Sequence, residues 1–428
     1  MSTLVLHLRQ RALLVLAAVV GILPLQAQQP ADTHTRIFDS SFKSLRASLV
    51  DSYYAPPVIR LGSGEQLAVE FDQLSAERRY LRYCLVHCDA MWQPSQIVES
   101  EYIDGFNEAE VENASFSSAT FANYVHYSIA LPNDDMQLRL SGNYLLKVYE
   151  EGDPDNVLLQ QRFSVVESAV GLKVDVSSRT DVDYNAGHQQ LTLAVDTRDY
   201  PIDNLYDGLK VAVLQNSRFD NSVLLTRPSR VAGTVVSFEH DPRLIFTGGN
   251  EFRRFEMVTT DYNGMGVERY SYHAPYYHVE LHGDEPRFDR SYSYDRTQFG
   301  RFTIRMSSAH DNNTEADYMI VHFALHSPRL SGGAVYVDGE FTRHCFDNEN
   351  RMTYNEEAGC YELSAMLKQG AYNYQYLWVP DGSNVGQTAR IEGDFYQTVN
   401  QYEILVYNRR RGERYDRLIG YGIVYSGK

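Results

Sequence analysis

Short segments in which apolar and polar residues alternate recur along the chain, each bounded by residues that favour turns. In the first part of the chain such segments span residues 67–71, 80–86, 124–131, 144–149 and 159–166. Glycine, proline, asparagine and aspartate separate them at residues 62–64, 132–135, 141–143 and 152–155. A period of two with aromatic and β-branched residues is typical of half-buried strands. The pattern therefore predicts an all-β fold built from antiparallel β-sandwiches.

The same pattern continues to the C-terminus in two further series. Strands are predicted at residues 172–176, 190–195, 209–214, 235–238 and 252–259, and then at 335–341, 360–363, 370–376, 402–407 and 418–425. The step Asn263–Gly264 predicts a hairpin in the second series, which ends near residues 283–286. About 400 residues are too many for one core. We predict three tandem immunoglobulin-like β-sandwich domains, at residues 28–168, 169–286 and 287–428.

The first 27 residues follow a different pattern. Arg9 and Arg11 precede an apolar run at residues 12–25, which ends in the small-residue site Gln26–Ala27. This is the layout of a secretory signal peptide, and the run is shorter than the roughly 20 residues that span a bilayer. The alternative, a retained signal anchor, is disfavoured by that length. We expect cleavage after Ala27, and no later run predicts a membrane span.

The charge of the chain limits its partners. The formal net charge is −17, and removing residues 1–27 takes away two arginines and no acidic residue, which lowers it to −19. Nucleic acids require a basic surface, so we expect no nucleic-acid partner. An acidic balance also favours solubility.

Four cysteines allow disulfides in an exported protein. Cys84 and Cys88 lie in one predicted strand, about 13 Å apart if extended, which is too far for a bridge. Cys345 and Cys360 flank a predicted hairpin and form the better pair, and closing that loop would contribute roughly 3 kcal/mol. The alternative is that all four cysteines are buried free thiols, and the sequence does not decide between these two states.

Motifs for catalysis are absent from the sequence. It contains no nucleophile elbow, phosphate-binding glycine loop or zinc-protease motif. In His87-Cys88-Asp89 neighbouring side chains point to opposite faces of a strand, so we interpret Cys88 as buried and Asp89 as a turn residue. The segment that begins at Asp311 lacks the glycine and glutamate of a calcium loop. We predict no enzyme, catalytic residue, metal, cofactor or small-molecule substrate.

Tyrosine is abundant, with 32 copies. Tyr372, Tyr374 and Tyr376 alternate, so they share one face of a strand. The surrounding order of strands resembles early-set immunoglobulin-like domains, including glycogen-binding modules. This resemblance carries an alternative function, that of a surface or periplasmic carbohydrate-binding protein whose Tyr374 stacks on a sugar.

Two distant groups of motifs resemble one family. The first comprises His87-Cys88-Asp89, Trp92-x-Pro94-Ser95, Glu101-Tyr102-x-Asp104-Gly105-Phe106-Asn107-Glu108, Asn123-Tyr124-x-His126-Tyr127 and Leu140-Ser141-Gly142-Asn143-Tyr144; the second comprises Glu392-Gly393-Asp394-Phe395-Tyr396-Gln397-Thr398, Arg414-Tyr415-Asp416 and Leu418-Ile419-Gly420-Tyr421. This pattern is similar to the type IX secretion system plug protein family of Bacteroidota. Cys345 and Cys360 depart from it, because the family usually has aromatic or aliphatic residues there.

The resemblance implies a non-enzymatic component of the type IX protein secretion system. Such a protein binds the outer-membrane translocon β-barrel from the periplasmic side and seals its pore when no cargo is exported, so the implied location is the periplasm, at the inner side of the outer membrane. Polar residues among large aromatics are typical of interfaces, which makes Trp92, Tyr102 and Phe106 the candidate contact residues. The alternative for them is a cap on the first sandwich. A cargo protein of the same system is a further alternative for the chain.

Overall fold

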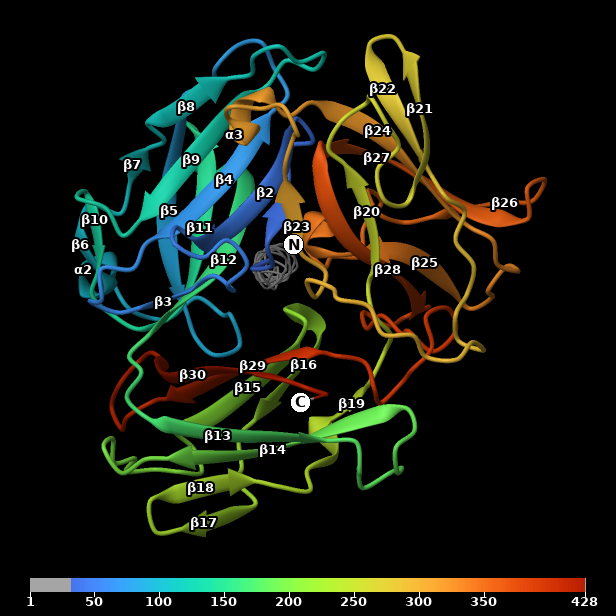
Figure 1. Cartoon of the computed structure of the whole chain (residues 1–428). Helices are drawn as coiled ribbons and strands as arrows, with labels where there is room; N and C mark the ends of the chain where they lie inside the picture. Colours follow the sequence, from blue (N-terminus) through green and yellow to red (C-terminus); the bar gives the residue numbers. More distant parts are fainter. Residues whose placement is uncertain (1–31, 428) are drawn as a thin grey trace, which may run out of the picture. The chain divides into compact units, whose positions relative to one another are not determined.

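Paired β-sheets form most of the regular structure in residues 32–427, the part of the chain that the computed structural model describes (Figure 1). The prediction of an all-β fold with tandem β-sandwiches is confirmed. The expected signal peptide at residues 1–27 lies outside the described residues. From Thr33 onward the chain forms one compact unit that contains three sandwiches.

The first sandwich consists of two facing sheets and a small two-stranded sheet. One sheet has the order β1-β12-β11-β5-β7, with β3 parallel to β12, and the other has the order β2-β4-β9-β8. The bounds are β1 Arg36–Ile37, β2 Phe42–Leu49, β3 Val58–Arg60, β4 Leu67–Gln73, β5 Leu81–Cys88, β6 Ile103–Gly105, β7 Ala109–Glu110, β8 Asn113–Phe116, β9 Val125–Leu131, β10 Met136–Leu138, β11 Gly142–Glu150 and β12 Val157–Val166, with the short helix α2 at Glu99–Tyr102.

The middle sandwich lies below the first in Figure 1 and pairs early strands with the last strands of the chain. One sheet is β13-β14-β18-β17 with β19 beside β14, and the facing sheet is β16-β15-β29-β30. The bounds are β13 Gly171–Ser177, β14 His188–Asp196, β15 Leu209–Gln215, β16 Arg218–Leu225, β17 Arg230–Ala232, β18 Val235–Phe238, η1 Pro242–Leu244, β19 Ile245–Thr247, β29 Gln401–Asn408 and β30 Arg417–Tyr425.

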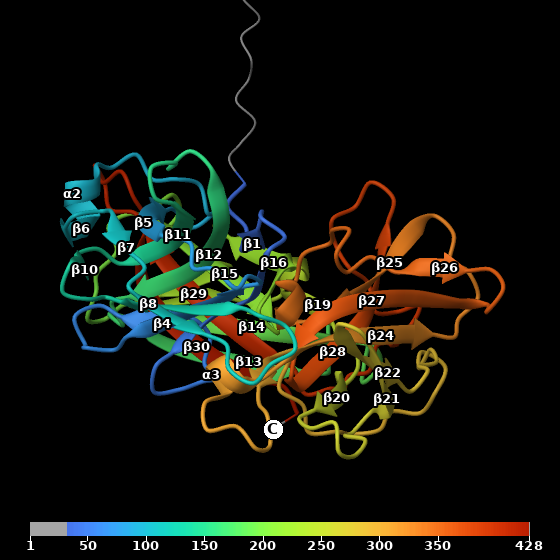
Figure 2. The same ribbon diagram turned by 90° about the horizontal axis from the view of Figure 1, so that it is seen from above.

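The third sandwich is built around the long strand β28, which lies next to β20, β23 and β25. The facing sheet has the order β21-β22-β24-β27-β26, and both views show it beside the first sandwich (Figures 1 and 2). The bounds are β20 Arg253–Met257, β21 Val267–His273, β22 Tyr276–Leu281, β23 Phe302–Ile304, α3 Asn312–Glu315, β24 Tyr318–Leu325, β25 Gly333–Asp338, η2 Glu340–Thr342, β26 Thr353–Asn355, β27 Cys360–Lys368 and β28 Gly370–Pro380.

The observed strand pairing differs from the domain boundary that we expected between residues 286 and 287. Strands on each side of that position belong to the sandwich on the other side. Strands β29 and β30 were assigned to the third domain, but β29 pairs with β15 over its whole length. Strands β20 to β22 were assigned to the middle domain, but β20 pairs with β28 and β22 with β24. The expected hairpin at Asn263–Gly264 is also wrong, since β21 instead pairs with β22. Which edge a strand joins depends on the face it buries and on the free edges, and these are not local properties.

Buried polar contacts join the sandwiches to one another. Between the first and third, Lys368 Nζ lies 2.7 Å from Asp72 Oδ2, and both side chains are at most 2 % exposed. Between the first and middle, Asp416 accepts a hydrogen bond of 2.9 Å from the backbone of Ala90, and within the middle sandwich Asp416 pairs with Lys210 at 2.8 Å. Such contacts are strongly directional inside a protein. They therefore fix how the three sandwiches are arranged.

Helices contribute little to this fold. The α-helices among residues 32–427 are α2 and α3, with four residues each. Within that described range no helix has the length and apolar character needed to cross a bilayer.

Candidate functional site

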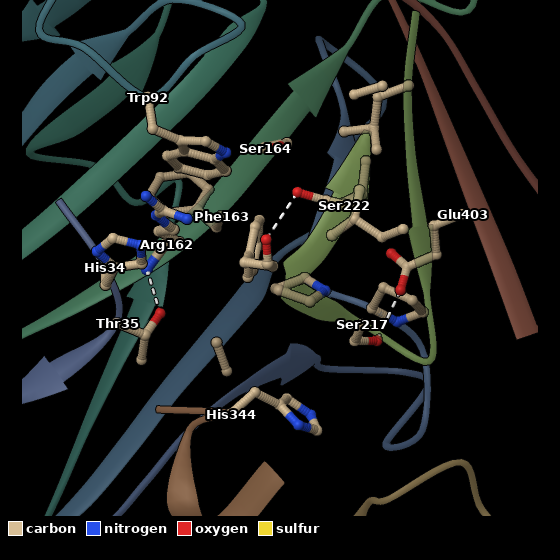
Figure 3. Close-up of a pocket in the computed structure, with 18 of the residues that line it drawn as sticks. His34, Thr35, Trp92, Arg162, Phe163, Ser164, Ser217, Ser222, His344 and Glu403 are labelled. Carbon is tan, nitrogen blue, oxygen red and sulfur yellow. Dashed lines mark hydrogen bonds between the residues drawn. The ribbon is translucent and has the colours of Figure 1, made fainter. Parts of the chain in front are cut away.

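A cavity of about 380 Å³ lies where the three sandwiches meet (Figure 3). The first sandwich contributes strands β2 and β12 and the turn after β5. The middle sandwich contributes β15, β16 and β29, and the third contributes the segment around η2. Ligand cavities in proteins typically measure about 300–1,000 Å³ and favour junctions between domains. The cavity is therefore large enough for a small organic molecule.

Apolar side chains form most of the cavity wall between the first and middle sandwiches. Leu214 and Leu405 are each 6 % exposed and pack with Ala90 in one cluster. The Arg162 guanidinium lies against two aromatic rings, 4.3 Å from the Trp92 centroid and 4.6 Å from that of Phe219. Figure 3 shows Trp92 stacked on Arg162 at this end of the cavity. Stacking on aromatic faces is a favoured environment for arginine.

Arg46 and Arg301 line the cavity on the side of the third sandwich, together with Arg343, which pairs with Glu349 at 2.8 Å. Arg46 is 5 % exposed, and its Nη2 donates a hydrogen bond to the Tyr53 carbonyl. Burial lowers the pKa of Arg46, although Glu340 and Glu70 act in the opposite direction. Arg301 is 7 % exposed and donates to Gln401 Oε1 at 3.1 Å. Buried charges are unfavourable unless they are paired and fully hydrogen-bonded, so this side of the cavity is suited to an anion.

The acidic and hydroxyl groups of the cavity do not form a nucleophile. Ser217 Oγ donates to Glu403 Oε1 at 2.6 Å (Figure 3). His344 Nδ1 lies 3.0 Å from Asp338. Burial would raise the pKa of the Asp338 carboxyl group, but His344 and Arg218 hold this pKa below its ordinary value. Among the hydrogen bonds of the described residues, none joins Ser217 to His344. The arrangement can bind a ligand, but it lacks the coupled serine and histidine of an acyl-transfer site.

The structure does not bring the predicted contact residues together. Tyr102 is 4 % exposed in the core of the first sandwich and donates to the Leu85 carbonyl. Trp92 lies at the central cavity, 5.8 Å from the ring of Phe219. Phe106 is 82 % exposed in the loop between β6 and β7. Tyr102 is therefore a core residue, and of the three only Phe106 is largely accessible to a partner.

The motif His87-Cys88-Asp89 has the structural role expected from the sequence. His87 is 1 % exposed and contacts Ser95 Oγ at 2.9 Å. Burial raises the pKa of Cys88 to about 12, so its thiol is protonated at neutral pH. Asp89 Oδ1 accepts hydrogen bonds from the backbone of Met91 and of Gln93. Within residues 32–427 no group of three or more His, Cys, Asp or Glu side chains is arranged to hold a metal ion.

The tyrosine face of β28 is not a binding surface. Tyr372, Tyr374 and Tyr376 share one face, as expected, but they are 2 %, 4 % and 0 % exposed. The face packs into the core of the third sandwich, and the hydroxyls of Tyr374 and Tyr376 both donate to Asp284. This corrects the expectation that Tyr374 stacks on a sugar. The alternative carbohydrate-binding function therefore loses one of its two supports, the tyrosine face, and keeps only the resemblance to glycogen-binding modules.

The two cysteines of the expected disulfide have different surroundings. Cys345 Sγ lies 3.5 Å from the Thr35 carbonyl, next to the first sandwich. Cys360 begins β27, faces Asn355 of β26 and is a free thiol with Sγ 3.7 Å from Glu362. The structure therefore does not contain the bond, and the pairing of Cys345 with Cys360 stays a prediction.

An exposed aromatic cluster was missed by the sequence analysis. Phe121, in the loop before β9, is 54 % exposed and lies 5.3 Å from the rings of both Tyr272 and Tyr277. The tyrosines belong to the β21–β22 hairpin of the third sandwich, so this aromatic cluster bridges two sandwiches. The tyrosine-rich hairpin is visible in the sequence, but its contact with a loop about 150 residues away is not. Exposed aromatic groups of this kind often mark interaction surfaces.

Comparisons with known proteins were made for the whole chain. Residues 42–167 match the family model described as "Type 9 secretion system plug protein 1st domain". A crystal structure of a hypothetical protein from Parabacteroides merdae ATCC 43184 is similar, with 42 % sequence identity and a TM-score of 0.91, over 92 % of this chain and 100 % of that chain. An alkylpurine DNA glycosylase from Pseudomonas fluorescens, with 12 % identity over 29 % of this chain and 30 % of its own, has a TM-score of only 0.18. No curated protein matches.

Proposed function

We propose that this chain, which belongs to the type 9 secretion system plug protein family, binds the outer-membrane translocon barrel from the periplasmic side and seals its pore between cargo molecules. The observation that supports this proposal most directly is the family match over residues 42–167. A role in type IX secretion follows from that membership. Within type IX secretion, sealing of the pore is the specific role that fits this fold best.

A seal needs a body that keeps its shape. In this structure the buried ion pair Asp72–Lys368 connects the first sandwich to the third, and a hydrogen bond from the backbone of Ala90 to the buried Asp416 connects the first sandwich to the middle one. Buried polar groups with all partners in place favour one defined arrangement. The sandwiches therefore resist movement against each other, which is consistent with a passive seal.

The accessible aromatic residues indicate two surfaces for the barrel. One is Phe106, the exposed member of the residues expected from the sequence. The other is the aromatic cluster formed by Phe121, Tyr272 and Tyr277. Aromatic residues dominate the binding energy of many protein interfaces, and truncating one at the centre of an interface typically weakens binding by about 2 kcal/mol or more. These residues are therefore the ones to change first.

The test is an affinity pull-down of the tagged protein from detergent-solubilised outer membranes, with mass spectrometry of the proteins recovered. We expect a very large β-barrel protein, without the cargo-shuttle protein in the same complex. The variants Phe106→Ser and Phe121→Ser identify the contact surface, and we expect one of them to reduce recovery. Tyr184→Ser is the matched control, because Tyr184 is 64 % exposed in the middle sandwich. Failure of the unchanged protein to recover any barrel would refute the proposal.

A further inference from the structure

The polar side of the central cavity holds two arginines without an ionic partner. Arg46 comes from β2 of the first sandwich, and Arg301 precedes β23 of the third. They are 5 % and 7 % exposed, and among residues 32–427 no carboxylate oxygen lies within 4.0 Å of either guanidinium. The guanidinium groups of Arg46 and Arg301 donate hydrogen bonds to uncharged groups: the Tyr53 carbonyl, and the carbonyl or hydroxyl groups of Gln298, Ser217 and Gln401.

Two buried guanidinium groups without a carboxylate partner are unfavourable when no ligand is bound. Removing a charge from water costs several kcal/mol unless an opposite charge compensates for it. Burial lowers the pKa of Arg46, and the nearby Arg301 acts in the same direction, whereas Glu340 and Glu70 oppose this shift without forming an ion pair with Arg46. An anion that accepts hydrogen bonds from both groups would relieve the unfavourable charge of the pair.

Another part of the cavity wall is apolar. Leu214 and Leu405 line it from the middle sandwich, and Leu45 lines it from β2. His34 and Met91 line the cavity and are exposed to solvent. The cavity thus combines a cationic end with an apolar wall, and a small molecule can reach it.

We propose that the central cavity binds an organic anion that consists of an apolar chain ending in a single carboxylate. The carboxylate accepts hydrogen bonds from Arg46 and Arg301, and the chain lies along Leu214 and Leu405. Planar carboxylates match the fork of donors on a guanidinium. A doubly charged phosphate fits less well, because Glu340 and Glu403 line the same cavity and would repel it.

This inference does not depend on the sealing role. The cavity is internal to the chain and needs no other component of a secretion system. The pull-down described above could fail while the ligand binds, and the ligand could fail to bind while the barrel is recovered. The two proposals are therefore refuted by different measurements.

The test is isothermal titration calorimetry of the full mature chain with octanoate, and with octanol as the uncharged probe. We expect saturable octanoate binding that is weakened at least about tenfold in Arg46→Met, because the variant loses a hydrogen bond between two charged groups, which is stronger than a hydrogen bond between neutral groups. Octanol binding should not change in that variant. Arg301→Met is read in the same way if Arg46→Met fails to fold.

Two further variants control the experiment. Ala212→Phe places a ring in the cavity that Ala212 lines and should abolish binding of both probes. Arg329→Met removes an exposed arginine, 69 % accessible at its side chain, and should leave both affinities unchanged. The dipeptide acid N-acetyl-Leu-Leu, compared with its amide, distinguishes a peptide C-terminus from a fatty acid as the natural source. If neither octanoate nor the peptide acid binds, or if Arg46→Met binds octanoate as tightly as the unchanged chain, the proposal is wrong.

Discussion

The ion pair between Lys368 and Asp72 allows a quantitative test of how the first and third sandwiches are joined. Lys368 Nζ lies 2.7 Å from Asp72 Oδ2, which also accepts a hydrogen bond of 2.6 Å from the Tyr318 hydroxyl. Asp72 Oδ1 lies 2.7 Å from His126 Nδ1. In Lys368→Met the carboxylate stays buried with two of its three partners. Removing one member of a buried pair typically costs about 3–5 kcal/mol of stability. Because two hydrogen bonds to Asp72 remain, we expect the free energy of unfolding to fall by about 3 kcal/mol.

The pH dependence of this loss follows from the pKa of Asp72. Burial alone would raise it, but Lys368 and His126 outweigh burial and hold the pKa below its ordinary value. A carboxyl group with a lowered folded pKa stabilises the protein above its unfolded pKa of about 3.9 and loses that contribution as the pH falls through the folded pKa. Without Lys368, burial dominates and the pKa rises, so the variant gains stability on acidification. The difference between the two proteins should therefore shrink as the pH falls from about 7 toward about 4, where the variant's Asp72 takes up its proton, and should shrink further below about pH 4, where the unchanged protein loses the contribution of Asp72.

The assay is urea unfolding of both proteins at pH 7 and near pH 4, followed by circular dichroism. The double variant Asp72→Asn with Lys368→Met removes both charges of the buried pair, and we expect it to regain about 2 kcal/mol relative to Lys368→Met alone. Arg329→Met is the control, because its pair with Glu356 is exposed and should contribute less than about 1 kcal/mol. The reasoning is refuted if Lys368→Met loses no more than the control, or if its deficit grows at low pH.

Three shorter predictions concern other buried groups. Burial raises the pKa of Cys84 to about 11 and that of Cys88 to about 12, so a thiol reagent at pH 8 should label them only after denaturation; rapid labelling of the folded protein would contradict this. Glu392 is 1 % exposed between two arginines, so Glu392→Gln should lower the free energy of unfolding by about 3 kcal/mol, while Glu356→Gln should change it by less than about 1; equal effects in urea would contradict this. Tyr374→Ala should lower the melting temperature, because it opens a core cavity worth about 3–5 kcal/mol; normal stability would contradict its burial.

Local sequence patterns were sufficient to predict the strands and the class of fold. In β9 the residues alternate between buried and half-buried positions along its whole length, which is the pattern read from residues 124–131. The role of Asp89 as a turn residue was also predictable, because its carboxylate bonds to amides two and four residues away. These features depend on neighbours in the chain and need no knowledge of distant contacts.

The tertiary structure decided which faces and edges meet. Alternation placed Tyr372, Tyr374 and Tyr376 on one face, but whether that face meets water or another sheet depends on strands that are far away in sequence. The same holds for β29. Its sequence is that of an ordinary apolar strand and does not show that it pairs with β15. The sequence also predicted neither the cavity nor the burial of Arg46, because both arise where three sandwiches converge. Strand formation is a local preference with a period of two, whereas burial and charge pairing are sums over the whole fold, so the sequence by itself determined the strands and their assembly determined the candidate sites.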